Sequence, residues 1–117
     1  MVMPFRSVTA AIALAAAISA YQSRASAASF NCMNVEDMNA AEQTVCVNHR
    51  LGALDERLDS WYRRALIRAG YFEQTADVRE DQRAWLAERN ACGANVGCLR
   101  RAYVRRIREL KDYVEHV

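Results

Sequence analysis

Four cysteines are the residues whose type and spacing could carry chemistry in this chain of 117 residues. They are Cys32, Cys46, Cys92 and Cys98. Gaps of 13, 45 and 5 residues separate them, so the chain lacks the C-x2-C pair that is typical of zinc sites and of thioredoxin-like redox sites. Structural disulfides are therefore expected, and neither a metal nor another cofactor is.

Four cysteines allow three disulfide connectivities. We favour Cys32 with Cys46 and Cys92 with Cys98, because each pair brackets a local element and the second pair joins two helix ends across a turn. A domain of about 90 residues has a small core. Two disulfides would therefore supply much of its stability.

Histidines and paired carboxylates are the remaining candidates for catalysis, and neither is arranged for it. Nucleophilic catalysis needs a Ser, Thr or Cys beside a base, yet His49 lies in a charged connector and His116 lies next to the end of the chain. Asp55 and Asp59 share a helix face, but Arg63 follows Asp59 by four residues, which favours a weak surface pair. The sequence therefore does not predict an enzyme.

Asp55 has a second possible partner in the core. It follows the apolar position Leu54, while Arg89 and Arg106 lie near the apolar stripes of their own helices. One of these arginines could pair with Asp55 between helices as a structural ion pair. The alternative is that all three are separate surface charges.

The first 27 residues have the order of a secretory signal peptide. Arg6 precedes an uncharged run from Val8 to Ala20, and the small residues Ala25-Ser26-Ala27 stand before the expected cleavage. The run is shorter than the roughly 20 apolar residues of a membrane-spanning helix, and Cys32 lies too far beyond it for lipid attachment. We expect a signal peptide at 1–27, a single domain at 28–117, no membrane anchor, and a periplasmic or secreted protein.

Removing the signal changes the charge balance. The 16 basic residues lose Arg6 and Arg24, which leaves 14 against 14 acidic residues, none of which precedes Glu36. A nucleic-acid partner is therefore not expected. Residues 28–60 nevertheless carry six acidic and two basic side chains, so this half is acidic and the remainder is basic.

Apolar periodicity predicts an all-α domain with one short and three long helices, in a disulfide-stapled bundle. Residues 30–38 show no period and are expected to run extended. Asn39 can cap a short helix over 40–46, with Glu42 in the capping-box position, and residues 47–49 follow as a connector. A long helix then begins at Arg50 and is expected to end with Gly70 at the C′ position.

Two more long helices follow. Thr75 is expected to cap a helix that continues to Ala91, where Trp85 must supply much of the burial because the apolar face is thin. After the corner between Cys92 and Cys98, apolar residues from Leu99 onward step by three and four nearly to the C-terminus. Short connections make neighbouring helices antiparallel, so we expect an up-down-up bundle with the short helix across one end.

The order of these features resembles the lysozyme inhibitor LprI-type N-terminal domain family of bacterial secreted and lipoprotein domains. The residues that carry the resemblance are Phe30-Asn31-Cys32, Ala41-Glu42, Val45-Cys46, Leu51, Leu54-Asp55, Tyr62, Gln82-Arg83-Ala84-Trp85-Leu86, Arg89-Asn90-Ala91-Cys92, Cys98-Leu99, Tyr103, Arg106-Ile107 and Leu110. The resemblance implies a helical, disulfide-bonded envelope domain, with lysozyme inhibition in some members. It carries over no inhibitory residue, and this chain lacks the lipobox of the lipoprotein members.

Together these features predict a periplasmic or secreted binding protein that resembles a lysozyme inhibitor and acts by occlusion. The acidic residues Glu36, Asp37 and Glu42 are the candidate contacts, because secreted lysozymes are commonly basic and opposite charge speeds association. The alternative is an accessory or structural envelope protein that binds another partner without inhibiting it. The sequence specifies no oligomeric state.

Overall fold

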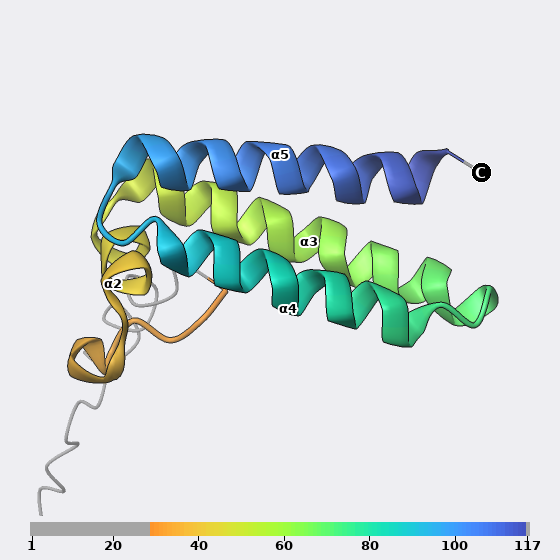
Figure 1. Ribbon diagram of the computed structural model, residues 1–117, viewed down its shortest axis with the longest axis horizontal. Coiled ribbons are helices and arrows are strands. Elements are labelled where there is room, and N and C mark those ends of the chain that lie inside the picture. The colour runs from red at the N-terminus through yellow and green to blue at the C-terminus, as the bar shows by residue number, and fades with distance from the viewer. Residues whose placement is uncertain (1–28, 117) are drawn as a thin grey trace, which may run out of the picture.

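The computed structural model describes residues 29–116, and within them the fold is all α (Figure 1). The elements are the 3-10 helix η1 (Val35–Asp37), the short helix α2 (Ala40–Val47) and the long helices α3 (His49–Tyr71), α4 (Thr75–Ala91) and α5 (Val96–Glu115). The prediction of one short and three long α-helices is confirmed. The predicted signal peptide, residues 1–27, lies outside the described residues. None of the described helices is both long and apolar enough to cross a membrane.

The long helices form an antiparallel bundle with α2 across one end (Figure 1). α3 leads away from that end, α4 returns to it and α5 leads out again, which is the expected up-down-up order. The apolar faces of the four α-helices meet in one core, because each helix has its apolar residues at spacings of three and four. Its buried members are Ala41, Val45, Leu51, Leu58, Ala65, Ala69, Val78, Trp85, Leu99, Tyr103, Ile107 and Leu110.

Two disulfides staple the end of the bundle that holds α2, which we call the disulfide end. Cys32 is bonded to Cys46, with Cα atoms 5.7 Å apart, and Cys92 to Cys98, with Cα atoms 5.6 Å apart. These are the pairs that the spacing favours. The first disulfide ties the N-terminal segment to α2, and the second joins the end of α4 to the first turn of α5.

Trp85 supplies much of the burial of α4, as the thin apolar face of that helix requires. The side chain is 3% exposed, and its indole N–H donates to the backbone carbonyl of Ala102 in α5 at 3.0 Å. The ring also packs edge-on against Tyr103, with ring centroids 5.1 Å apart. A buried indole needs such a hydrogen-bond partner, so Trp85 fixes how α4 lies against α5.

The connection between α2 and α3 is shorter than predicted. Val47 ends α2 and His49 begins α3, so Asn48 alone separates the two helices. The expected connector over 47–49 is therefore wrong. Asn48 caps the end of α2 and the start of α3. Its backbone N–H bonds to the carbonyl of Thr44, and its side chain accepts from the backbone N–H of Leu51 at 3.1 Å.

The end of α3 also differs from the prediction. Gly70 lies within the helix, which continues to Tyr71, and the left-handed residue that follows is Glu73, with φ of 55°. The backbone N–H of Gln74 bonds to the carbonyl of Ala69 at 2.9 Å, which closes the helix end around Glu73. Gln74 rather than Thr75 is the N-cap residue of α4.

The segment over residues 30–38 is not extended throughout, as the sequence suggested. It contains η1, in which the backbone N–H of Asp37 bonds to the carbonyl of Asn34 at 3.1 Å. At the next helix the prediction is right: Asn39 caps α2, and its side chain accepts from the backbone N–H of Glu42 at 2.9 Å.

Candidate functional site

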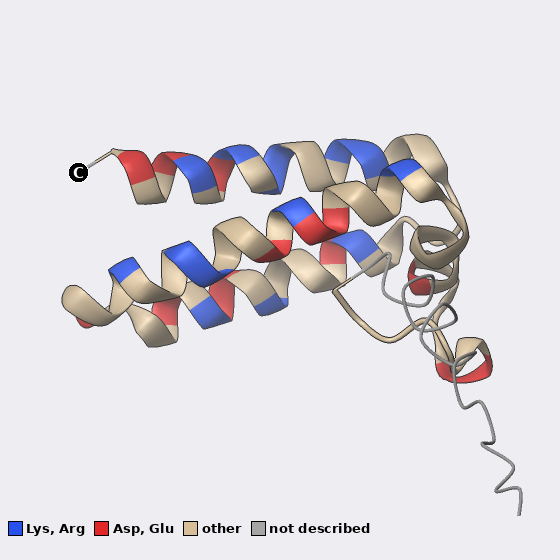
Figure 2. Ribbon diagram, turned by 180° about the vertical axis from the view of Figure 1, so that it is seen from behind, with Lys and Arg blue, Asp and Glu red and all other residues tan. Residues whose placement is uncertain are grey.

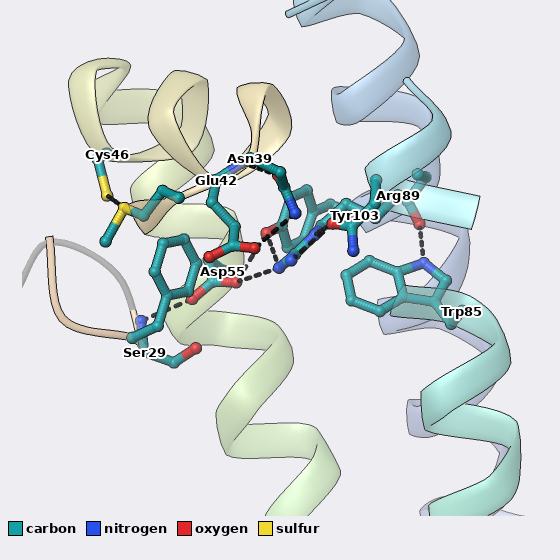
Figure 3. Close-up of polar contacts among 12 residues, drawn as sticks. Ser29, Asn39, Glu42, Cys46, Asp55, Trp85, Arg89 and Tyr103 are labelled. Carbon is teal, nitrogen blue, oxygen red and sulfur yellow. Dashed lines mark hydrogen bonds and ion pairs between the residues drawn. The ribbon is translucent and has the colours of Figure 1, made fainter. Parts of the chain in front are cut away.

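Asp55 lies in α3 at the centre of a buried polar network (Figure 3). Asp55 is only 3% exposed. Oδ1 accepts a hydrogen bond from the Tyr103 hydroxyl at 2.7 Å, and Oδ2 accepts from the backbone N–H of Ser29 at 2.6 Å. The carboxylate therefore joins α3, α5 and the N-terminal segment.

Arg89 of α4 supplies the opposite charge. It is 5% exposed, its Nη1 lies 4.0 Å from Oδ1 of Asp55, and it donates to the Tyr103 hydroxyl at 3.3 Å. Its guanidinium also lies over the rings of Phe30 and Trp85, 5.6 and 5.8 Å from the centroids. The hydroxyl of Tyr103 bridges the two charges, so three helices meet at one polar cluster.

Arg106 does not join this network, although the sequence left it as a possible partner of Asp55. Its Nε donates to Oε1 of Gln82 at 3.0 Å, and its Nη1 lies 3.2 Å from Oε2 of Glu109. Of the three charges proposed for an ion pair, the structure brings only Asp55 and Arg89 together. The described residues leave no buried side-chain polar atom without a hydrogen-bond partner, so the buried polar atoms of this cluster are all paired.

Sequence reasoning missed Ser29 and Tyr103 as members of this network. Tyr103 stands on an apolar stripe of its helix, and that position alone predicts only a place in the core. Its residue type was the available signal, because a fully buried phenol needs a partner for its hydroxyl. Ser29 contributes through its backbone, so no side-chain pattern could have revealed it.

The pH dependence of stability should report on Tyr103. Burial, and then the nearby Asp55 carboxylate, raise the pKa of Tyr103 well above its usual range, against a smaller opposing effect of Arg89. The unfolded chain would lose this proton near pH 10 while the folded chain keeps it, so the free energy of unfolding should fall as pH rises above about 10. Urea denaturation between neutral pH and about pH 11 measures this fall.

Two conservative variants separate Tyr103 from the other tyrosines. Tyr103→Phe should flatten the pH dependence, whereas Tyr71→Phe should leave it unchanged because Tyr71 is 83% exposed. An equal slope in the wild type and in Tyr103→Phe would contradict the assignment of the raised pKa.

The acidic loop, residues 33–38, projects from the disulfide end of the bundle (Figure 2). It contains η1, and both Glu36 and Asp37 are exposed. The disulfide at Cys32 holds its start, while the side-chain amide of Gln43 donates to the carbonyls of Val35 and Met38 at 3.0 and 2.9 Å. The loop is therefore exposed and yet fixed to α2.

Glu42 lies apart from the other two candidate acidic contacts. Its Oε1 accepts from the side-chain amide of Asn39 at 2.6 Å, which completes the cap of α2. It also lines a cleft of about 530 Å³ together with Ser29, Phe30 and Asp55. Since its carboxylate is used by the cap, Glu42 is a poorer contact for a partner than Glu36 or Asp37.

Exposed apolar side chains accompany the two free carboxylates. Met33 and Val35 of the acidic loop are 72% and 41% exposed, and Val47 at the end of α2 is 82% exposed. The available signal in the sequence was the presence of apolar residues in a stretch that has no helical period. Protein-binding surfaces commonly combine apolar groups with charged groups at their rim.

Residues 32–110 match the family model described as lysozyme inhibitor LprI. The chain belongs to the LprI family. No curated protein and no solved structure matches the chain. The matched LprI segment begins at the first cysteine, and it contains both disulfides, the acidic loop and the three side chains of the buried network.

LprI-family membership and the site geometry agree on the kind of site to expect. The family is described by inhibition, which needs a binding surface and no catalytic group of its own. No group of three or more metal-ligating side chains is found among residues 29–116. Lysozyme-inhibitor-like function is what membership of the family suggests.

Proposed function

We propose that this LprI-family protein is exported to the periplasm or medium and binds lysozyme through the acidic loop, so that the loop occludes the enzyme. Glu36 and Asp37 would meet a basic partner, and Met33, Val35 and Val47 would supply apolar contact area. The protein would act as a binding protein without catalytic residues or a cofactor. Two disulfides suit an oxidising compartment, which supports export.

The observation that carries the proposal is the combination of exposure and rigidity in one acidic segment. A flexible loop loses conformational entropy when it binds, whereas a loop that is already ordered loses little. Here the Cys32–Cys46 disulfide and the two hydrogen bonds from Gln43 order the loop in advance. Its two carboxylates can then raise the association rate with a basic enzyme, and salt should screen this effect.

Inhibition should depend on the charges of the loop. We expect the mature protein, purified from the periplasm or medium with its N-terminus near Ala28 established by intact mass, to slow lysis of a cell-wall suspension by lysozyme. The double substitution Glu36→Lys/Asp37→Lys should weaken inhibition by at least about tenfold, because it places like charges against a basic partner. Inhibition by the wild type should also weaken as salt is added.

Glu80→Lys/Asp81→Lys is the matched control. Both residues are exposed neighbours on α4, and the substitution changes the net charge by the same amount at a different place. It should leave inhibition nearly unchanged. Equal loss in both double variants would assign the effect to net charge rather than to the acidic loop.

Two further outcomes decide between the proposal and its alternative. Unchanged lysis at a large excess of protein in low salt would rule out inhibition and favour a non-inhibitory accessory protein of the envelope. If neither salt nor the loop substitutions alter inhibition, the protein is still an inhibitor, but the acidic loop is not its contact surface.

A further inference from the structure

A second surface lies at the disulfide end, between the beginnings of α3 and α5. It is a groove of about 470 Å³ whose lining includes Arg50, Leu51, Leu54, Arg57, Val96 and Arg100. We call it the basic groove. Nothing in the proposed function uses it.

The groove combines positive charge with an apolar floor. Arg50, Arg57 and Arg100 are exposed, and none of them lies within 4.0 Å of a carboxylate oxygen among residues 29–116. Leu54 is half-buried between them, and Val96 is 45% exposed. Its ligand should therefore carry at least two negative charges close to apolar side chains.

The acidic loop of the same protein has this chemistry. Glu36 and Asp37 supply two neighbouring carboxylates, and Met33 and Val35 supply exposed apolar side chains beside them. The loop cannot serve its own groove, because the Cys32–Cys46 disulfide and Gln43 hold it against α2 and no loop residue lines the groove. A second copy of the chain can supply it.

We propose that two copies of this protein associate by placing the acidic loop of each in the basic groove of the other. The acidic loop and the first turns of α3 and α5, whose side chains line the basic groove, lie at the same end of the bundle (Figure 1). In the proposed dimer a twofold axis at that end makes both contacts equivalent. Each contact pairs up to three arginines with two carboxylates and covers apolar groups on both sides. Because the contact is made twice, a charge substitution acts twice on the same dimer.

Self-association has a consequence for inhibition, which rests on the proposed function. The dimer covers Glu36 and Asp37, so the dimer and the lysozyme complex compete for the same loop. Dilution or a basic partner would release the loop. The dimer is thus an inactive form of the inhibitor, in which the acidic loop is covered and cannot bind lysozyme.

Charge exchange between the two surfaces tests the dimer. Sedimentation velocity at low salt should give a dimer for the wild type and monomers for Glu36→Lys/Asp37→Lys and for Arg57→Glu/Arg100→Glu, with dimerisation weakened at least about tenfold in each. Mixing the two variants should restore a dimer. The reversed loop of one then faces the reversed groove of the other, and the unaltered loop and groove also meet.

The mixture is the decisive measurement, because loss of folding cannot restore association. A second mixture, of Arg57→Glu/Arg100→Glu with Glu80→Lys/Asp81→Lys, has the same opposite net charges but no reversed loop, so Arg57→Glu/Arg100→Glu should stay monomeric in it. Glu80→Lys/Asp81→Lys should remain dimeric, and far-ultraviolet circular dichroism should show every variant as helical as the wild type. A monomeric wild type at high concentration in low salt would overturn the proposal. Dimers that persist in both single-surface variants, or a mixture of those two variants that stays monomeric, would overturn it equally.

Inhibition assays keep this proposal separate from the proposed function. Arg57→Glu/Arg100→Glu should inhibit lysozyme at least as well as the wild type, because its acidic loop is intact and uncovered. A restored dimer in the mixture together with no inhibition by any variant would leave self-association established and the lysozyme proposal rejected.

Discussion

Replacing Asp55 with asparagine is expected to lower the free energy of unfolding by about 3–5 kcal/mol. The substitution removes the only carboxylate within 4.0 Å of Arg89 among the described residues, and because Arg89 is only 5% exposed, its charge is left largely buried without a counter-charge. It also removes the anionic acceptor for the Tyr103 hydroxyl and the Ser29 backbone N–H. Urea denaturation of Asp55→Asn beside the wild type measures the difference.

Asp59→Asn is the matched control, one turn further along α3. Asp59 also pairs with an arginine, Arg63, but that arginine side chain is 75% exposed, so the loss should stay below about 1 kcal/mol. The double variant Asp55→Asn/Arg89→Met should lose less than the sum of its single variants, because it leaves no buried charge unpaired. An unchanged denaturant midpoint in Asp55→Asn would show that the network contributes nothing to stability.

The helices could be predicted because their apolar residues recur at a period that backbone geometry sets. Leu51, Leu58 and Ala65 follow one another at intervals of seven, and all three are buried on one face of α3. Asn39 was recognisable as a cap because Glu42 follows at the required spacing. These signals are local, so a single sequence contains them.

Helix ends were predicted less well because residue preference does not determine the conformation. Gly70 favours a helix end, yet the chain places Glu73 in the left-handed region, since the bond from Gln74 to Ala69 closes the helix there. Asn48 was expected within a longer connector, although one asparagine can cap two helices. Such choices depend on which hydrogen bonds the whole chain can complete.

The buried pair of Asp55 and Arg89 shows which part of a site could not be predicted from the sequence. Both Arg89 and Arg106 lie near apolar stripes, and both are buried, at 5% and 7% exposed. Which of them meets Asp55 depends on how far α4 and α5 slide and rotate against α3. The sequence determines which residues share a face of each helix, but it does not determine how the helices lie against one another. In the structure, Arg89 is the arginine that lies beside Asp55.

Removing the Cys32–Cys46 disulfide should affect both stability and function. The disulfide closes a loop with a sequence separation of 14, so Cys32→Ala/Cys46→Ala should lower the free energy of unfolding by about 3 kcal/mol in the chain-entropy model. It also releases the start of the acidic loop, which then depends on Gln43 alone. Under native conditions the loop should therefore bind lysozyme more weakly, because it must be ordered on binding.

Removing the Cys92–Cys98 disulfide separates the loss of stability from the loss of order in the acidic loop. Cys92→Ala/Cys98→Ala opens a loop with a sequence separation of 6 and should cost about 2.4 kcal/mol in the same model. It joins the end of α4 to the first turn of α5 and does not hold the acidic loop, so inhibition by the folded variant should stay near that of the wild type. Equal loss of inhibition in both variants, measured where both are folded, would mean that stability alone matters. Loss confined to Cys32→Ala/Cys46→Ala would identify order in the acidic loop as the property that inhibition requires.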